Sequence, residues 1–203
     1  MKKVNLSIDV GGTHTRLQVE IIENGKITFT SQEYKQKINS KEELKSFIRS
    51  SLNDIDSNIR LTRCVIGFAG AVIDHGKVEI TNWKNTPTII LEDLVKWGLP
   101  ENNTIMINDM ELAGYGILDM EEKDEMDSIQ CEILYKPEFT ANNSTNNKLV
   151  IAPGTGFGTA SIIEFTNHAG EKINSVLSSE IQHIQVPPLD GRHAEIIDII
   201  LSN

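Results

Sequence analysis

The sequence predicts an α/β fold with mixed sheets, because strand-like and helix-like segments alternate along the chain. Residues 4–33 read as three antiparallel strands, and helix, strand and helix follow. Two glycine-rich segments, DVGGTHTR at 9–16 and APGTGFGT at 152–159, each lie between two apolar strand-like runs. A strand that turns on glycines and continues as a strand forms a β-hairpin, so each half of the chain is expected to contain one.

Strands in the first half are predicted at 4–10, 15–22, 26–33, 61–68 and 104–107, from alternation or from continuous apolar runs between turn residues. Helices are predicted at 91–99 and 110–118, and an earlier helix begins at Ser40, because Ser40 and Glu43 have capping-box spacing. The stretch 67–83 is expected to be irregular, because three glycines interrupt it. The apolar face of the first helix consists of Leu44, Phe47, Ile48 and Leu52.

The second half repeats the strand and hairpin pattern from residue 148 onwards. Strands are predicted at 149–152, 158–164 and 172–177, with a turn at 167–170. The stretch 119–147 is expected to hold a solvated helix end, an extra strand at 129–135 and a mobile loop, and 194–201 is expected to be an apolar helix. We therefore expect two domains, at 1–109 and 110–203, the second built on the plan of the first.

Composition excludes several classes of partner. The chain has 203 residues, of which 39% are hydrophobic, and its formal net charge is −10. No nucleic acid or anionic membrane surface is expected as a partner, because the sequence has no basic patch. No apolar run approaches the roughly 18 residues of a membrane span, and the N-terminus does not read as a signal peptide. Cys64 and Cys131 show no metal-binding spacing, so reduced thiols and a cytoplasmic location are expected.

The glycine turns are candidate anion sites. Glycine lets backbone N–H groups approach an anion closely, so two such hairpins can grip a polyphosphate between them. The sequence lacks the Lys-Ser/Thr pair of a P-loop, and its glycine turns lead into strands, not into the helix of a dinucleotide fingerprint. Asp9, at the end of a buried strand, is placed to hold Mg²⁺. The alternatives are an ordinary tight turn and a turn-capping aspartate.

Two polar pairs are candidate catalytic or binding groups. Asn108 and Asp109 lie where a strand gives way to a helix, so Asp109 can accept the proton of an attacking hydroxyl, and Asn108 can hold a second hydroxyl. The alternative for Asp109 is an N-cap. Glu180 and His183, at i and i+3, suit vicinal sugar hydroxyls, although without other context an ordinary surface pair is favoured, and the two are too few for a metal site.

Three motifs together resemble the bacterial glucokinases: DVGGTxxRL at 9–17, IND at 107–109 and PGTGFG at 153–158. Those enzymes belong to the actin/hexokinase/Hsp70 superfamily, in which two ribonuclease-H-like domains close over ATP. The resemblance implies this fold, ATP and Mg²⁺ as cofactors, and phosphorylation of a hexose such as glucose at its 6-hydroxyl, with Asp109 as the base. It implies phosphate binding by Asp9, Gly11, Gly12, Thr13, Gly154, Thr155 and Gly156, and sugar contacts from Asn108, Asp109, Glu180 and His183.

The chain departs from the family pattern at three places. His14 stands where the family usually has Asn, and Ile181-Gln182 replaces paired glycines, which puts glucose specificity in question. The family pattern continues beyond Asn203, through a further sugar-binding glutamate and an adenosine-binding segment. We therefore expect a member shortened at its C-terminus, with little turnover of its own and self-association through the helix at 194–201.

Two other functions stay open on the sequence. One is a catalytically inactive sugar-binding or regulatory protein of the same fold, for which sugar binding would occur without ATP turnover. The other is a different phosphotransferase or phosphatase that uses the same hairpins, which a panel of substrates would distinguish.

Overall fold

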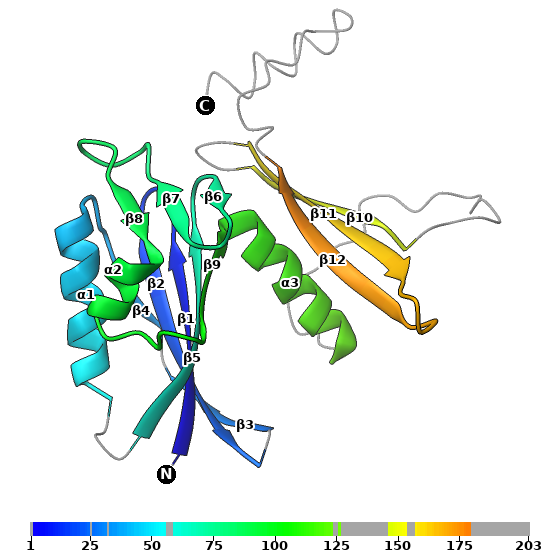
Figure 1. The fold of residues 1–203 in the computed structure, drawn as a ribbon, viewed down its shortest axis with the longest axis horizontal. Coiled ribbons are helices and arrows are strands. Elements are labelled where there is room, and N and C mark those ends of the chain that lie inside the picture. Colours follow the sequence, from blue (N-terminus) through cyan, green and yellow to red (C-terminus); the bar gives the residue numbers. More distant parts are fainter. Residues whose placement is uncertain are drawn as a thin grey trace, which may run out of the picture.

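The structure, a computed structural model, describes residues 2–24, 26–31, 33–55, 59–123, 126, 146–153 and 157–179. Its largest element is a mixed six-stranded sheet in the order β3-β2-β1-β5-β9, with β4 also paired to β2 (Figure 1). The strands are β1 (Lys2–Val10), β2 (Thr15–Glu23), β3 (Lys26–Thr30), β4 (Tyr34–Gln36), β5 (Ile59–Phe68) and β9 (Thr104–Asn108).

The pairing confirms the three antiparallel strands expected at the N-terminus. β1 pairs with β2 and β2 with β3 in antiparallel register, whereas β5 and β9 join the sheet in parallel. The single strand expected at 26–33 is wrong: β3 ends at Thr30, and β4 forms separately. β3 and β4 pair with different parts of β2. Between them, the Ser31 amide donates to the Val19 carbonyl at 2.8 Å, and the Ser31 hydroxyl accepts from the Val19 amide at 3.0 Å.

Two helices cover one face of this sheet (Figure 1). α1 (Lys41–Asn53) begins as expected, because the Ser40 hydroxyl accepts from the Glu43 amide at 3.2 Å and the Glu43 carboxylate accepts from the Asn39 amide at 2.8 Å. α2 (Leu91–Lys96) ends before the expected residue 99, and Gly98 follows with a φ of +111°. Of the predicted apolar face, Leu44, Phe47 and Ile48 are buried and Leu52 is partly buried.

A small antiparallel sheet was not predicted. It consists of β6 (Val72–Ile73), β7 (Lys77–Glu79) and β8 (Thr88–Ile90). The turn between β6 and β7 places Asp74 and His75 at φ values of 49° and 53°, and the Gly76 amide donates to the Ile73 carbonyl. Strands of two or three residues are too short to show an alternating pattern, which is why 67–83 read as irregular.

A second three-stranded sheet packs on the long helix α3 (Asp109–Glu122), which lies between the two larger sheets in Figure 1. It consists of β10 (Lys148–Pro153), β11 (Phe157–Thr166) and β12 (Lys172–Ser179), in antiparallel pairs. Ala160, Ile162 and Val176 of this sheet form a buried cluster with Met110 of α3. Apolar side chains that stay exposed on these strands are Leu149, Ile151, Phe165, Ile173 and Leu177.

Glycines let α3 approach both sheets closely. A Cβ on Gly67 of β5 would lie 2.8 Å from Leu112 Cδ2, and one on Gly158 of β11 would lie 2.6 Å from Met110 Sδ. A Cβ on Gly114 of α3 itself would lie 2.5 Å from Val176 Cγ1 of β12. Real Cβ atoms do not come so close, so a side chain at any of these positions would force a neighbour to shift: the flexible ends of Leu112 and Met110 in two cases, and the β-branched Val176 in the third.

Some expectations fall outside the described residues: the strand at 129–135, the helix at 194–201 and the environment of Cys131. The domain boundary after residue 109 stays a prediction. Within the described part of the chain, no helix combines the length and the apolar character needed to cross a lipid bilayer.

Replacing Gly114 with alanine is expected to destabilise the protein by about 1–2 kcal/mol, because overpacking against Val176 outweighs the gain in helix propensity. The same change at Gly116 is the matched control, because an added Cβ there meets nothing within 4 Å. Gly116→Ala should stabilise by about 0.5–1 kcal/mol. Urea unfolding of both variants measures the difference, and equal effects of the two would contradict the close contact.

Cys64 is expected to resist alkylation in the folded protein. Its side chain is buried, and burial raises the pKa of its thiol to about 12, so almost no thiolate exists near neutral pH. Iodoacetamide at pH 8, followed by peptide mass spectrometry, should modify Cys64 only after denaturant is added. Rapid labelling of Cys64 without denaturant would show that this part of the core opens readily.

Candidate functional site

The candidate site lies at one edge of the first sheet, where three parallel strands end. Val10 of β1 is in register with Phe68 of β5, and Phe68 is in register with Asn108 of β9. The Ala69 amide donates to the Val10 carbonyl at 2.9 Å, which holds the chain leaving β5 against the end of β1. The first glycine turn and Asp109 therefore emerge at the same edge of the sheet, a common position for binding sites in α/β proteins.

The first glycine turn presents exposed backbone amides. The Gly11 amide donates to the His14 carbonyl at 3.1 Å and closes the turn, whereas the amides of Gly12 and Thr13 have no backbone partner within the described residues. Both residues are exposed. Two adjacent unpaired N–H groups on a glycine turn form the kind of concavity that binds an anion.

Asp9 is paired with Arg16, a partner that the sequence analysis did not assign. The Arg16 guanidinium donates to Asp9 Oδ2 at 2.9 Å and lies 3.6 Å from a Glu33 oxygen. Asp9 and Arg16 are directly opposite each other in the β1–β2 hairpin, one position outside the Val10–Thr15 pair. For Asp9 the structure shows this ion pair, not the turn cap that the sequence left open as the alternative, and its predicted metal role stays a prediction.

Asn108 and Asp109 form the N-terminus of α3. The N-cap is Asn108, which is 5% exposed: its Oδ1 accepts from the amides of Met110 and Glu111, and its Nδ2 donates to the Gly70 carbonyl at 2.9 Å. Asp109 is the first helical residue, half-buried, and its Oδ1 accepts from the Met110 amide at 2.8 Å. The capping role that the sequence left open as the alternative for Asp109 is filled by Asn108.

The second hairpin is anchored beside Asp109. Pro153 and Phe157 are paired across its base, and Gly158 lies against the Met110 side chain, next to Asp109 in the chain. The structure thus brings the base of this hairpin to the N-terminal turn of α3. The predicted site residues Gly154, Thr155, Gly156, Glu180 and His183 lie outside the described residues.

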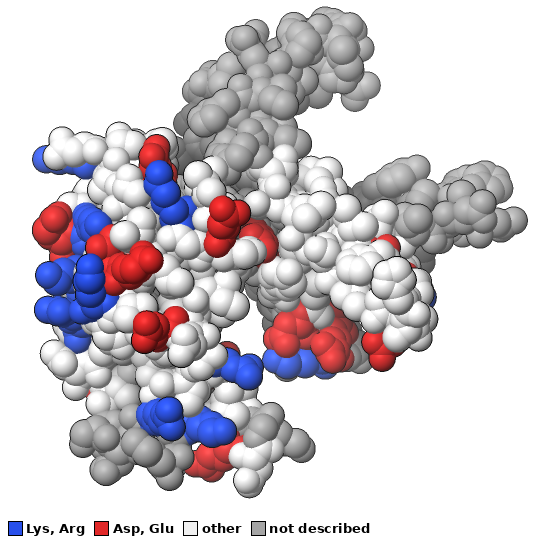
Figure 2. Space-filling model, in the orientation of Figure 1, with Lys and Arg blue, Asp and Glu red and all other residues white. Residues whose placement is uncertain are grey.

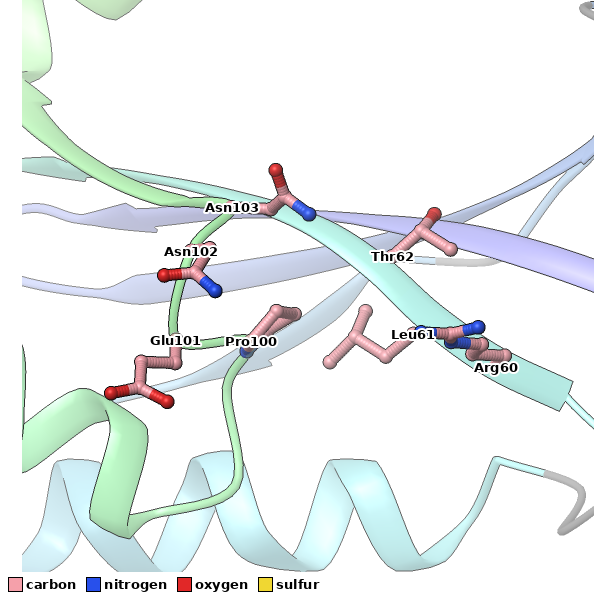
Figure 3. A pocket seen from close by; sticks show the side chains of 7 residues that line it. All are labelled: Arg60, Leu61, Thr62, Pro100, Glu101, Asn102 and Asn103. Atoms are coloured by element: carbon pink, nitrogen blue, oxygen red, sulfur yellow. The ribbon is translucent and has the colours of Figure 1, made fainter.

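Hollows elsewhere on the described surface are lined by other residues than the glycine turn and the start of α3. One of about 340 Å³ lies at the opposite end of the sheet, between the start of β5 and the segment before β9, where Arg60 and Glu101 are its charged residues (Figure 3). Another of about 260 Å³ lies between α1 and α2, with four basic and two acidic side chains in its lining, on a surface that carries charges of both signs (Figure 2). No cluster of three His, Cys, Asp or Glu side chains suited to a metal ion occurs among the described residues.

Comparison with known proteins identifies the family. The sequence model of the family described as glucokinase matches residues 6–203. This chain belongs to the glucokinase family. "Probable glucokinase 2" of Trichomonas vaginalis is 26% identical over 201 residues, which are 93% of this chain and 50% of that protein.

Solved glucokinases share the fold. The crystal structure of glucokinase from Balamuthia mandrillaris in complex with glucose matches with a TM-score of 0.75 and 25% identity, over 98% of this chain and 54% of that one. A ROK family glucokinase from Streptomyces griseus in complex with glucose and AMPPNP matches with a TM-score of 0.54 and 22% identity, over 91% and 51% of the two chains. The likeness confirms the predicted actin-like fold class, and the chain spans about half the length of these relatives.

Replacing Asn108 with alanine is expected to destabilise the protein by about 2 kcal/mol, because it removes the cap of α3 and leaves the Gly70 carbonyl without its donor. Asn108→Ser is the matched variant: its hydroxyl can still cap the helix but cannot reach Gly70, so a smaller loss is expected. Thermal or urea unfolding measures both. A loss below about 0.5 kcal/mol for Asn108→Ala would contradict the buried double role.

Proposed function

We propose that this protein takes part in ATP-dependent phosphorylation of a hexose, with glucose as the first candidate, at the 6-hydroxyl and in the cytoplasm. The observation that carries the proposal is the meeting of an anion-binding glycine turn and a carboxylate, Asp109, at one edge of the sheet. Membership of the glucokinase family supports it, as do the solved relatives that hold glucose or AMPPNP.

The first glycine turn would hold nucleotide phosphates. The amides of Gly12 and Thr13 are exposed and unpaired within the described backbone, and Gly12 carries no side chain to block an oxyanion. Bound ATP-Mg²⁺ would supply the phosphoryl group and a counter-charge for the transition state. Mg²⁺ keeps waters and needs only one or two protein carboxylates, so Asp9 alone suffices as a protein ligand, directly or through water. Gly154, Thr155 and Gly156 are proposed as the second phosphate turn.

Asp109 would act as the base. As the sugar oxygen forms its bond to the transferred phosphorus and the bond to the leaving phosphate breaks, the hydroxyl proton would pass to the Asp109 carboxylate. Asn108 fixes where that carboxylate lies, because it ties the start of α3 to Gly70. Direct sugar contacts from Asn108, Glu180 and His183 belong to the same proposal.

Asp109→Asn should abolish most glucose 6-phosphate formation and leave folding unchanged, because it removes the proton acceptor but keeps the side-chain shape. Asp119→Asn, an exposed change on the same helix that loses only an ion pair with Lys123, is the control and should keep the activity. A sensitive end-point assay with labelled ATP measures turnover, circular dichroism measures folding, and calorimetry measures glucose binding.

The outcomes separate the proposal from its main rival. Glucose-dependent phosphorylation by the unmodified chain and Asp119→Asn, but not by Asp109→Asn, supports a kinase with Asp109 as base. Glucose binding without any turnover indicates a sugar-binding or regulatory protein of the same fold. Equal turnover by Asp109→Asn and the unmodified chain would leave Asp109 with a structural role only.

A further inference from the structure

The segment 80–87 approaches the first glycine turn from a distant part of the sequence. It follows β7, leads into β8, and is closed on itself by backbone hydrogen bonds: the Ile80 amide donates to the Pro87 carbonyl at 3.1 Å, and the Thr86 amide to the Trp83 carbonyl at 3.2 Å. Ile80 and Trp83 are 3% and 4% exposed and belong to the same core cluster as Val10, the last residue before the glycine turn. The loop and the turn therefore rest on one core.

Asn82 lies directly on that turn. Its side-chain nitrogen, Nδ2, is 3.2 Å from the point where a Cβ on Gly12 would be. Asn82 is exposed, and the structure gives its amide no hydrogen bond within the described part of the chain. A side-chain donor therefore lies close beside Gly12, on the turn whose Gly12 and Thr13 amides have no backbone partner within the described residues.

The loop that carries this side chain has a strained backbone. Asn85 and Thr86 have φ values of 65° and 43°, in the left-handed region that a β-branched residue such as Thr rarely adopts. The buried Trp83 indole N–H has no partner within the described residues. Each feature costs free energy, and strained turns of this kind are concentrated at ligand-binding sites.

We propose that the Asn82 carboxamide is a phosphate-binding group, whose N–H donates to an oxygen of the polyphosphate held at the Gly12–Thr13 turn. The inference rests on the proposed function and adds a side-chain donor to a site otherwise built from backbone amides. A hydrogen bond to a charged oxygen is about twice as strong as a neutral one, so one amide can contribute measurably to affinity.

Calorimetry of the 203-residue chain with magnesium tripolyphosphate and, separately, with glucose tests the proposal. Asn82→Ala should weaken tripolyphosphate binding by about tenfold and leave glucose binding within twofold of the unmodified chain. Asn82→Asp has the same shape, places a negative charge beside the phosphates and should weaken binding at least as much. Asn85→Gly is the control in the same loop: it relieves a positive φ, and tripolyphosphate affinity should not change.

Three results would overturn the proposal. Tripolyphosphate affinity of Asn82→Ala and Asn82→Asp within twofold of the unmodified chain would show that the amide does not contact phosphate. Equal weakening of glucose and tripolyphosphate binding would make Asn82 a support of the whole site. If the unmodified chain binds neither tripolyphosphate nor AMPPNP with Mg²⁺, the proposed nucleotide site itself fails, and that result is distinct from the first two.

Discussion

The contact of α3 with both sheets is the constraint on which the rest of the arrangement depends. Three glycines create it: Gly67 below the first turns of the helix, Gly158 beside Met110, and Gly114 against Val176. Among the described residues the core of the second sheet is small, and Met110 of α3 is one of its four buried residues. The base of the second hairpin is therefore positioned relative to Asp109 by van der Waals contact with one helical turn, which leaves little room for adjustment.

Local patterns in the sequence predicted most of the sheet and helices, because alternation, turn residues and caps act over a few residues. The capping of α1 by Ser40 and the hairpin around 11–14 are of this kind. Features set by distant parts of the chain were missed. Gly67 read as an interruption of the apolar pattern, whereas the structure uses it for close approach of α3. The β6–β8 sheet was missed because strands of two or three residues are too short to show an alternating pattern.

The candidate site shows the same division. Asp9 was identified from its position before a glycine turn. Its partner Arg16 could be inferred once the hairpin register is known, because Asp9 and Arg16 are opposite each other, one position outside the Val10–Thr15 pair. That Asn108 and not Asp109 is the N-cap could not be predicted, since either residue type makes a good N-cap. Only the tertiary bond from Asn108 to Gly70 shows which of them is buried and fixed. Asn82 carries no local signal, because the fold alone brings it to Gly12.

The two ends of the candidate site differ in how many of their backbone amides already have a hydrogen-bond partner. A helix N-terminus is an ordinary place for an anion, yet in α3 the first amides are already bonded to Asn108 and Asp109 side chains. An anion there would have to displace both side chains. At the glycine turn, by contrast, the Gly11 amide bonds to His14, and those of Gly12 and Thr13 have no backbone partner among the described residues. Hydrogen-bond donors therefore lie at one end and a carboxylate at the other, which is the polarity that the proposed transfer of a phosphoryl group to an alcohol would require.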